Sequence, residues 1–297
     1  MAGGFMQALK ERVLLFDGGM GSMMISAGLE RTEIPESWIE RHPEKIGSIH
    51  RDYIRAGADV IQTATFGASS IKLSATAGGA ALNPGRINRM AAEMLREEIE
   101  RAGAGCFAAG DMGPTGEFFP PVGGLDEKRA LESFRIQARA LAGGGVDLLL
   151  IETMSDLREA VTALRAAREV TDLPVAVELT FQKKPGGYFT IMGNTPREAL
   201  EALKREGADM AGANCTLDSS GMKGLAGVML RLDGPPLLFQ PNAGQPVMRE
   251  GRAVYLQKPE EFASGMAEIA ELGAGAVGGC CGTGPDFISA LRDRLGS

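Results

Sequence analysis

Cysteines are the first sign of chemistry in this chain of 297 residues. Cys215 lies near the end of the apolar segment Met210–Thr216, and the adjacent pair Cys280 and Cys281 ends the apolar segment Ala274–Cys281. Three thiolates delivered by the ends of two strands suit a tetrahedral Zn²⁺ whose fourth position stays open, which is the pattern of catalytic zinc. We therefore predict one zinc ion per chain, with these three cysteines as ligands and catalytic residues.

The same cysteines allow two other interpretations. Cys215 could be a small buried strand residue while Cys280 and Cys281 fill a turn, or the adjacent pair could be a redox pair. Cys106 begins an earlier apolar segment, at the opposite end of its strand, and is expected to be an inert packed thiol. Four cysteines make no disulfide scaffold, and adjacent ones rarely pair with each other, so we expect a reducing, cytoplasmic location.

A thiolate-rich zinc site predicts chemistry on a thiol substrate. The metal lowers the pKa of an incoming thiol, and the electron-rich ligands keep its sulfur nucleophilic, so alkyl transfer to sulfur is the direct implication. Asp17 and Glu152 end two other apolar segments and could bind an ammonium group. The backbone amides of Gly18, Gly19 and Met20 could bind a carboxylate. Together these groups describe an amino acid that carries a thiol.

The elements that must position these residues recur along the whole chain. Short apolar segments bounded by Gly or Pro alternate with amphipathic stretches, as expected for parallel strands buried on both faces and joined by helices. Eight such units favour an α/β fold, a single-domain (β/α)8 TIM barrel over residues 1–297 with its active site at the C-terminal ends of the strands. The predicted strands are Val13–Asp17, Asp59–Thr65, Cys106–Asp111, Asp147–Thr153, Pro174–Phe181, Met210–Thr216, Pro236–Asn242 and Ala274–Cys281.

Helices between these strands are indicated by apolar residues at helical spacing and by capping residues. Ser155, Thr195 and Thr283 are predicted to be N-caps. Long connections after the first two strands are expected to cover the barrel mouth. The clearest helical stretches are Arg86–Ala102, Asp126–Gly143, Ser155–Val170, Thr195–Arg205 and Pro259–Leu272.

Composition excludes several classes of function. The net charge of −7 and the absence of a dense Lys/Arg run argue against nucleic acid as a ligand. No segment is apolar for long enough to span a bilayer, and the N-terminal residues lack the apolar core of a signal peptide, so no membrane association is expected. With only two histidines, chemistry based on clusters of imidazoles is nearly excluded.

Seven short motifs, in order along the chain, resemble the homocysteine S-methyltransferase family. The resemblance runs from about Leu14 to Leu291 and implies a zinc-dependent barrel that methylates homocysteine to methionine. Single motifs are weak, but seven in order together with the cysteine set are specific. The motifs are Asp17–Gly21 (DGGMG), Thr63–Gly67 (TATFG), Gly113–Gly116 (GPTG), Ile151–Thr153 (IET), Gly212–Cys215 (GANC), Pro241–Gly244 (PNAG) and Gly278–Thr283 (GGCCGT).

The resemblance also implies roles for particular residues. Cys215, Cys280 and Cys281 would be the zinc ligands, and Asp17 and Glu152 would hold the homocysteine amino group. Asn242 would lie beside the zinc and could serve it when substrate is absent. The full set of predicted substrate-binding residues is Asp17, Gly18, Gly19, Met20, Thr65, Glu152, Asn214 and Asn242.

The methyl donor is less closely constrained by the sequence. The segment Pro241–Tyr255 looks most like the homocysteine module of cobalamin-dependent methionine synthase, but the chain has no Asp-x-His-x-x-Gly signature for holding a corrinoid. We therefore predict a methyl-corrinoid carried by a partner protein, with S-methylmethionine or S-adenosylmethionine, or betaine, as alternatives. A binding cage for a quaternary ammonium group, such as betaine, is built from aromatic rings. Apart from its phenylalanines, this chain has only Trp38 and three tyrosines to build one.

Two further interpretations belong to other classes. The glycine-rich segment Gly273–Gly284 could be a phosphate cradle of the kind found after the last strands of barrels, although no Lys or Arg lies near it. Alternatively, the barrel could be a non-catalytic module that stores zinc or docks a corrinoid partner.

Overall fold

Eight parallel strands form a closed barrel in the computed structural model, which describes residues 2–249 and 252–296. The sheet order is β1-β12-β9-β8-β5-β4-β3-β2, and a bridge between Phe16 and Val60 joins its two outer strands. The predicted (β/α)8 barrel is therefore confirmed. Its strands are β1 (Leu14–Leu15), β2 (Val60–Gln62), β3 (Phe107–Met112), β4 (Leu148–Met154), β5 (Val175–Leu179), β8 (Met210–Asp218), β9 (Leu237–Asn242) and β12 (Ala276–Val277).

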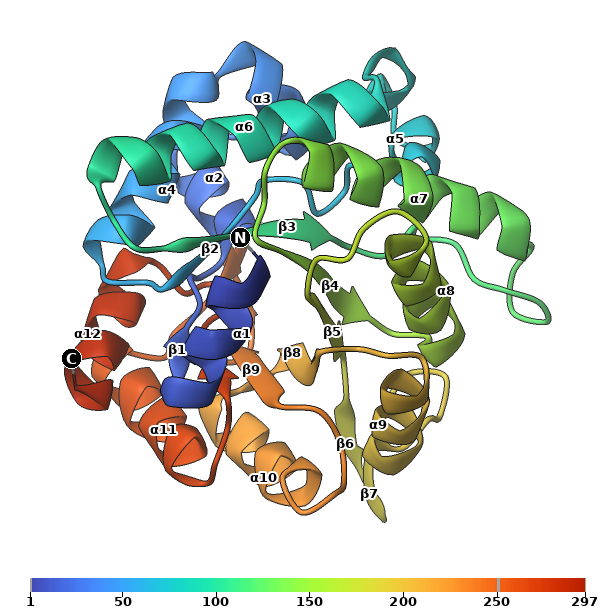
Figure 1. The fold of residues 1–297 in the computed structure, drawn as a ribbon. Coiled ribbons are helices and arrows are strands. Elements are labelled where there is room, and N and C mark those ends of the chain that lie inside the picture. Colours follow the sequence, from blue (N-terminus) through green and yellow to red (C-terminus); the bar gives the residue numbers. More distant parts are fainter. Residues whose placement is uncertain (1, 250–251, 297) are drawn as a thin grey trace.

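A ring of helices covers the outside of the barrel (Figure 1). Each of these helices buries one apolar face against the sheet and turns a polar face to solvent, as the amphipathic spacing requires. Among the described residues, no helix combines the length and apolarity needed to cross a bilayer. The ring consists of α4 (Pro43–Arg55), α6 (Pro84–Ala102), α7 (Glu127–Gly143), α8 (Leu157–Arg168), α9 (Pro196–Arg205), α10 (Ser219–Met229), α11 (Pro259–Glu271) and α12 (Pro285–Leu295).

Helix α1 (Ala2–Glu11) closes the N-terminal end of the barrel. It lies across the near end of the barrel in Figure 1. Phe5 and Leu9 are buried there, and the Phe5 ring meets that of Phe107 edge to face at 5.6 Å between centroids. The amphipathic start of the chain is thus a plug for the barrel interior, which leaves the C-terminal end as the mouth.

Side chains that point into the barrel change from apolar to polar along its axis. Because the strands are tilted, inward-facing residues of alternate strands share one layer. The layers nearest α1 hold only apolar residues, such as Phe16, Ala109, Ala176 and Leu238. The strand register then places polar residues in the layers nearer the mouth: Gln62, then Asp111, Glu178 and Gln240, then Glu152, Asn214 and Cys280.

Four strands, β1, β2, β5 and β12, end before their predicted boundaries, whereas β3, β4 and β8 run past theirs and β4 and β8 become irregular where the chain turns into the mouth. The register of β4 with β5 shifts between Ile151 and Met154, and that of β8 with β9 shifts between Asn214 and Asp218. Three residues other than glycine have positive φ there: Thr153 (57°), Cys215 (56°) and Thr216 (50°). Such backbone costs of the order of 1–3 kcal/mol per residue and is concentrated at functional sites.

Short helices and two hairpins build the walls of the mouth. The hairpins β6–β7 and β10–β11 follow β5 and β9, and neither was predicted from the sequence. The remaining elements are α2 (Met20–Ser26), η1 (Pro35–Ser37), α3 (Trp38–Arg41), α5 (Ser70–Ala75), η2 (Gly79–Ala81), β6 (Gln182–Lys184), β7 (Gly187–Phe189), β10 (Val247–Arg249) and β11 (Arg252–Val254).

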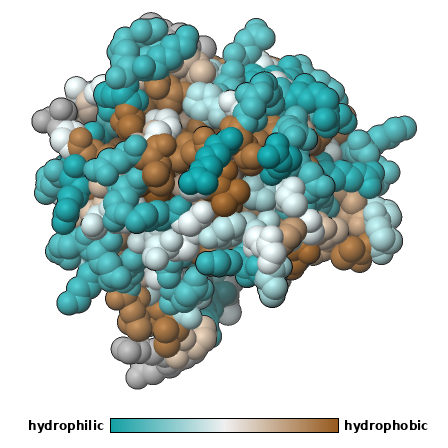
Figure 2. Space-filling view, turned by 90° about the horizontal axis from the view of Figure 1, so that it is seen from below, coloured by the Kyte–Doolittle hydropathy of each residue, from teal (hydrophilic) through white to brown (hydrophobic). Residues whose placement is uncertain are grey.

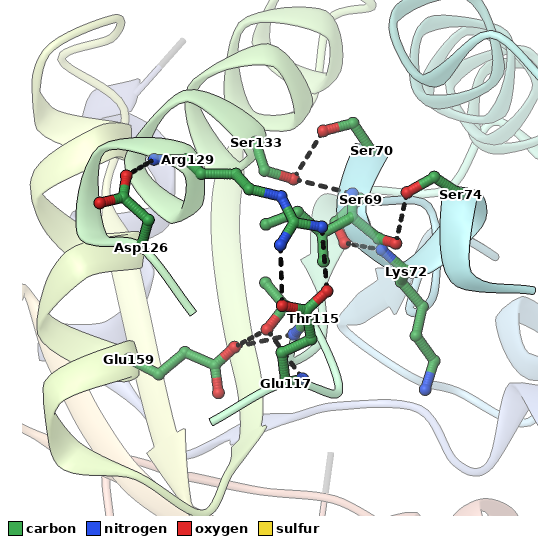
Figure 3. Close-up of polar contacts among 11 residues, drawn as sticks. Ser69, Ser70, Lys72, Ser74, Thr115, Glu117, Asp126, Arg129, Ser133 and Glu159 are labelled. Carbon is green, nitrogen blue, oxygen red and sulfur yellow. Dashed lines mark hydrogen bonds and ion pairs between the residues drawn. The ribbon is translucent and has the colours of Figure 1, made fainter. Parts of the chain in front are cut away.

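Polar contacts fix the loop after β3 to its neighbours (Figure 3). Both the amide and the hydroxyl of Thr115 donate to one carboxylate oxygen of Glu159, at 2.8 and 2.6 Å. The Arg129 guanidinium donates to both carboxylate oxygens of Glu117, at 2.8 and 2.9 Å. The GPTG motif is therefore held by helix α8, on the neighbouring unit of the barrel.

One of the three predicted N-caps is confirmed. Thr195 caps α9 in a capping box, with its hydroxyl accepting from the Glu198 amide while the Glu198 carboxylate accepts from the Thr195 amide. Ser155 is wrong as a cap because Asp156 takes that position and accepts from the Arg158 amide. Thr283 is wrong as well, since its hydroxyl donates to the Cys280 carbonyl and Gly284 precedes α12.

The substitution Thr195→Ala should lower the free energy of unfolding by about 1 kcal/mol, the usual cost of losing an N-cap hydroxyl. Ser155→Ala is the matched control, since this serine caps no helix. Denaturant titrations of both variants would measure the difference, and an equal loss of stability in the two would contradict the assignment.

Candidate metal and substrate site

The three cysteines singled out in the sequence converge at the barrel mouth. The Sγ atoms of Cys215, Cys280 and Cys281 all lie within 4.8 Å of one another, and those of Cys280 and Cys281 are 4.0 Å apart. Tetrahedral Zn²⁺ with Zn–S bonds of about 2.3 Å requires sulfurs about 3.8 Å apart. All three thiols are free of disulfides. The donor set and its spacing therefore fit a zinc ion with three protein ligands.

A tight turn presents the adjacent pair. Each backbone amide from Gly278 to Thr283 donates a hydrogen bond within the protein. The Asn242 side-chain oxygen accepts the hydrogen bond from the Cys281 amide at 3.1 Å, and the Ser22 hydroxyl accepts that from the Gly282 amide at 2.8 Å. The amides from Gly278 to Thr283, within the segment considered as a phosphate cradle, are therefore engaged inside the protein.

Two glycines that follow the first strand, Gly18 and Gly19, allow the cysteine turn to pack closely against that strand. A Cβ atom on Gly19 would lie 2.6 Å from the Cys280 carbonyl oxygen, and one on Gly18 would lie 2.4 Å from that of Thr283. The Gly19 amide donates to the Thr283 carbonyl at 3.0 Å, so it is already engaged within the protein. These glycines hold the cysteine turn against β1, a role that the carboxylate-binding prediction did not include.

Hydrogen bonds among the three thiols favour the ionisation of one of them. Hydrogen bonds from the Cys280 and Cys281 thiols hold the pKa of Cys215 far below its ordinary value, and those same contacts raise the pKa of Cys280. At the far end of the barrel, burial raises the pKa of Cys106 to about 11. Cys215 therefore ionises readily while the raised pKa of Cys280 keeps that thiol protonated, and Cys106 is a packed thiol as expected.

Glu152 and Asn214 are joined beside the cysteines. The Asn214 side-chain amide donates to the Glu152 carboxylate and, at 2.7 Å, to the Thr153 hydroxyl. Its oxygen accepts from the Thr153 amide at 2.9 Å, and its nitrogen lies 3.9 Å from the Cys280 sulfur. Asn214 thus ties the irregular end of β4 to that of β8, and it sets Glu152 next to the metal ligands.

Asp17 is fixed from the neighbouring strand. Its side chain is fully buried and accepts from the Gln62 amide at 3.0 Å and from the Gln62 side chain at 2.8 Å. Burial, only partly opposed by these bonds, raises the pKa of Asp17 to about 7. Burial and the nearby Cys215 raise that of Glu152 to about 7 as well. A cationic ligand bound near them would therefore stabilise the ionised form of both carboxyls.

Two more buried carboxyls lie below this pair, so the mouth has an excess of acid. Burial and the Glu152 charge raise the pKa values of Asp111 and Glu178 well above the ordinary range. Among the described residues, no lysine or arginine forms an ion pair with any of these four acids. An ammonium group entering the mouth would meet buried acids without a cationic partner and would favour their ionised form.

Other predicted residues serve the framework. The Thr65 hydroxyl is fully buried and donates to the Asp111 carbonyl at 2.6 Å, which holds β2 against β3. Met20 is half-buried at the start of α2 and packs on the core. Asn242 is buried and holds the cysteine turn through the Cys281 amide. Thr65 is thus engaged away from the open part of the mouth.

Three residues at the mouth were not predicted from the sequence. Gln62 orients Asp17, and Glu178 occupies the barrel interior. In the sequence, the only sign of these two roles is that each residue is a polar side chain inside an apolar segment. Tyr255 covers the cysteine turn, because a Cβ on Gly282 would lie only 2.3 Å from its ring. No pattern in the sequence marks Tyr255, since only the folded chain brings β11 over the turn.

Trp38 does not line an open cage for a quaternary ammonium group. Its ring is almost fully buried, with the Lys45 ammonium 4.4 Å from its centroid and the His42 ring 5.1 Å away. Tyr53 is also buried, and its hydroxyl donates to the Thr283 carbonyl. Trp38 and Tyr53 are therefore packed into the framework, and Tyr255 is the aromatic ring that lies beside the cysteine turn.

Stability of the metal-free protein should fall as the pH rises from about 4 to about 7. Asp17 and Glu152 have pKa values of about 7 in the folded chain, against about 4 when unfolded. The folded state therefore keeps protons that the unfolded state has released, and each shifted pKa unit costs about 1.4 kcal/mol once the pH exceeds both values. Urea titrations across this range should show the loss, and a double variant with Asp17→Asn and Glu152→Gln should show a shallower slope. Equal slopes would contradict the assignment.

Comparisons with known proteins place this geometry in a family. The fold resembles the metallated form of the homocysteine methyltransferase MmuM from Escherichia coli, with a TM-score of 0.77 and 23% identity over 95% of this chain and 96% of that one. Methionine synthases of Mycobacterium leprae and Mycobacterium tuberculosis are 29% and 30% identical over 95% of the chain, which spans 24% of the length of each. The family model described as homocysteine S-methyltransferase matches residues 14–295. The chain therefore belongs to the homocysteine S-methyltransferase family.

Proposed function

We propose that this barrel binds zinc through Cys215, Cys280 and Cys281 and methylates homocysteine to methionine. The observation that carries the proposal is the convergence of three free thiols beside buried carboxyls that lack a cationic partner. Zinc bound there would act as a Lewis acid that lowers the pKa of the substrate thiol. In the transfer, the homocysteine sulfur loses its proton and forms a bond to the methyl carbon, while the bond from that carbon to its donor breaks.

The chain's own residues would bind and orient the amino acid. Asp17 and Glu152 would accept hydrogen bonds from the ammonium group, whose charge the buried acids need. Gln62 and Asn214 hold these two carboxyls from opposite sides of the barrel. Binding would thus leave the substrate sulfur facing the cysteines, and orientation of this kind contributes strongly to catalysis.

The substitution Cys280→Ser should remove zinc and methyl transfer together while the barrel stays folded, because two thiols alone leave the site incomplete. Cys106→Ser is the matched control, since that thiol lies at the other end of the barrel. Zinc content by elemental analysis, circular dichroism and homocysteine turnover would measure the outcome. Retention of one zinc per chain in Cys280→Ser would contradict the ligand assignment.

The rim of the mouth supports a methyl donor carried by a protein. Exposed hydrophobic side chains follow five of the eight barrel strands on this face, and such grouping marks interaction surfaces. Among the residues whose burial the structure describes, two exposed large hydrophobic residues, Val228 and Leu272, belong to the outer helix layer instead. Figure 2 shows patches of hydrophobic side chains on a flank of the molecule. The rim consists of Ile25, Phe66, Val122, Ile191, Met192, Val247, Met248 and Leu256.

The relatives support the same interpretation. The chain matches about a quarter of each mycobacterial methionine synthase, so those proteins contain large segments beyond the matched part. In our proposal a partner protein supplies what such segments would add, a corrinoid that bears the methyl group. S-methylmethionine, S-adenosylmethionine and betaine are the competing donors, and a screen of all four donors would test the proposal. Turnover with a small donor alone would overturn it.

The substitution Ile191→Glu should raise the KM for a methyl-corrinoid protein about tenfold, because a charge on the rim would have to be desolvated on docking. The rate with free methylcobalamin should be unchanged, since Ile191 is 63% exposed and lies outside the cysteine cluster. Val228→Glu, on helix α10, is the control and should leave both rates unchanged. Equal effects of the two substitutions would contradict a docking role for the rim.

A further inference from the structure

Asp111 and Glu152 are two buried carboxylic residues that contact each other. They are only 3% and 9% exposed, and a hydrogen bond joins their side chains. The register of β3 with β4 pairs Asp111 with Leu150, so Glu152 lies two residues nearer the mouth on the same face of the sheet. The contact therefore links the layer of the predicted substrate contacts to the layer beneath it.

This contact requires a proton. Two ionised carboxylates offer only acceptors, so a hydrogen bond between carboxyls forms only when one of them carries an O–H group. Two negative charges at that distance inside a protein would also repel each other strongly. One of the two residues is therefore a neutral acid while the bond exists.

The other hydrogen bonds of the pair indicate which residue keeps the proton. Oε2 of Glu152 accepts from the Asn214 side-chain amide and, at 3.2 Å, from the Thr153 hydroxyl. Oδ1 of Asp111 has no partner among the described residues. Donors stabilise the ionised form of the carboxyl that accepts from them, which makes Glu152 the acceptor and Asp111 the donor. Burial raises the pKa of both carboxyls, and the bond between them adds to this rise for Asp111 and opposes it for Glu152.

The backbone of Asp111 is held on both sides. Its amide donates to the Thr63 hydroxyl at 3.0 Å, and its carbonyl accepts from the Thr65 hydroxyl at 2.6 Å. The Gln137 side chain on α7 donates to the same carbonyl at 3.4 Å. The donor that Asp111 presents to Glu152 therefore stands on a fixed segment of the barrel, as precise orientation requires.

We propose that Asp111 is a positioning residue of the homocysteine pocket: as a neutral acid it donates a hydrogen bond to Glu152 and holds that carboxylate where it meets the ammonium group. Glu152 is then fixed from two strands, by Asp111 on β3 and by Asn214 on β8. A carboxylate has about four acceptor sites, so it can hold these donors and still accept from the ammonium group. The inference rests on the proposed function for the identity of the ligand.

Two substitutions of similar size test the donor. Asp111→Asn keeps a neutral group with an N–H donor and should leave the KM for homocysteine within about twofold of the original value. Asp111→Leu removes the donor and should raise that KM about tenfold, with a smaller change in kcat and an unchanged zinc content. Equal damage by both substitutions, or an unchanged KM in Asp111→Leu, would overturn the proposal.

A double-mutant cycle tests whether Asp111 acts through Glu152. Calorimetric binding of homocysteine to the zinc-loaded protein would be measured for Asp111→Leu, Glu152→Ala and the double variant. In the Glu152→Ala background the loss of affinity caused by Asp111→Leu should shrink from about tenfold to within about twofold. An equal loss in both backgrounds would contradict the positioning role. Absence of homocysteine binding by the original protein would instead refute the proposed function.

Infrared difference spectroscopy tests the donor without substrate or metal. At pH 8, above the pKa of about 7 of Glu152, the spectrum of the original protein minus that of Asp111→Asn should contain a carboxylic-acid C=O band. Carboxylate bands alone would show that Asp111 is ionised and cannot donate, which overturns the proposal. This measurement decides the state of Asp111 even if Asp111→Leu does not fold.

Discussion

The confinement of acidic and thiol groups inside a closed barrel is the constraint on which the site depends. Inward-facing side chains have no solvent to turn to, so each polar one needs a partner within the barrel or a ligand. Here the polar layers hold carboxyls and thiols, and within residues 2–249 and 252–296 no lysine or arginine pairs with them. In the proposed function, a metal ion and an ammonium group would bring in the positive charge that this arrangement lacks.

The framework around the site maintains this arrangement. Asn214 and Gln62 hold the carboxyls of Glu152 and Asp17, and the amides of the cysteine turn are all used within the protein. The positive φ angles of Thr153 and Cys215 occur where β4 and β8 leave their regular register. The strained backbone therefore turns Glu152 and Cys215 toward the same point, and the rest of the barrel stabilises it.

Small residues at the mouth act through what they allow to approach. Gly18 and Gly19 let the turn with Cys280 pack on the first strand, and Gly212 lies where a Cβ would meet the Leu238 carbonyl at 2.0 Å and Glu178 at 3.2 Å. Close packing of backbone at the barrel mouth therefore explains these three glycines. The family motifs DGGMG and GGCCGT are two sides of one contact.

The sequence by itself determined the barrel, because apolar strands buried on both faces and amphipathic helices repeat eight times. It also determined the cysteine set, since Cys215, Cys280 and Cys281 follow strands two apart in that barrel. Only the tertiary structure decided which polar residues share a layer. Gln62 and Tyr255 lie far along the chain from the residues they contact, and the layer that Glu178 occupies depends on strand tilt and register, which local pattern does not specify. The hairpins and the rim were also decided at this level, because loops that cover a mouth take their shape from contacts with one another.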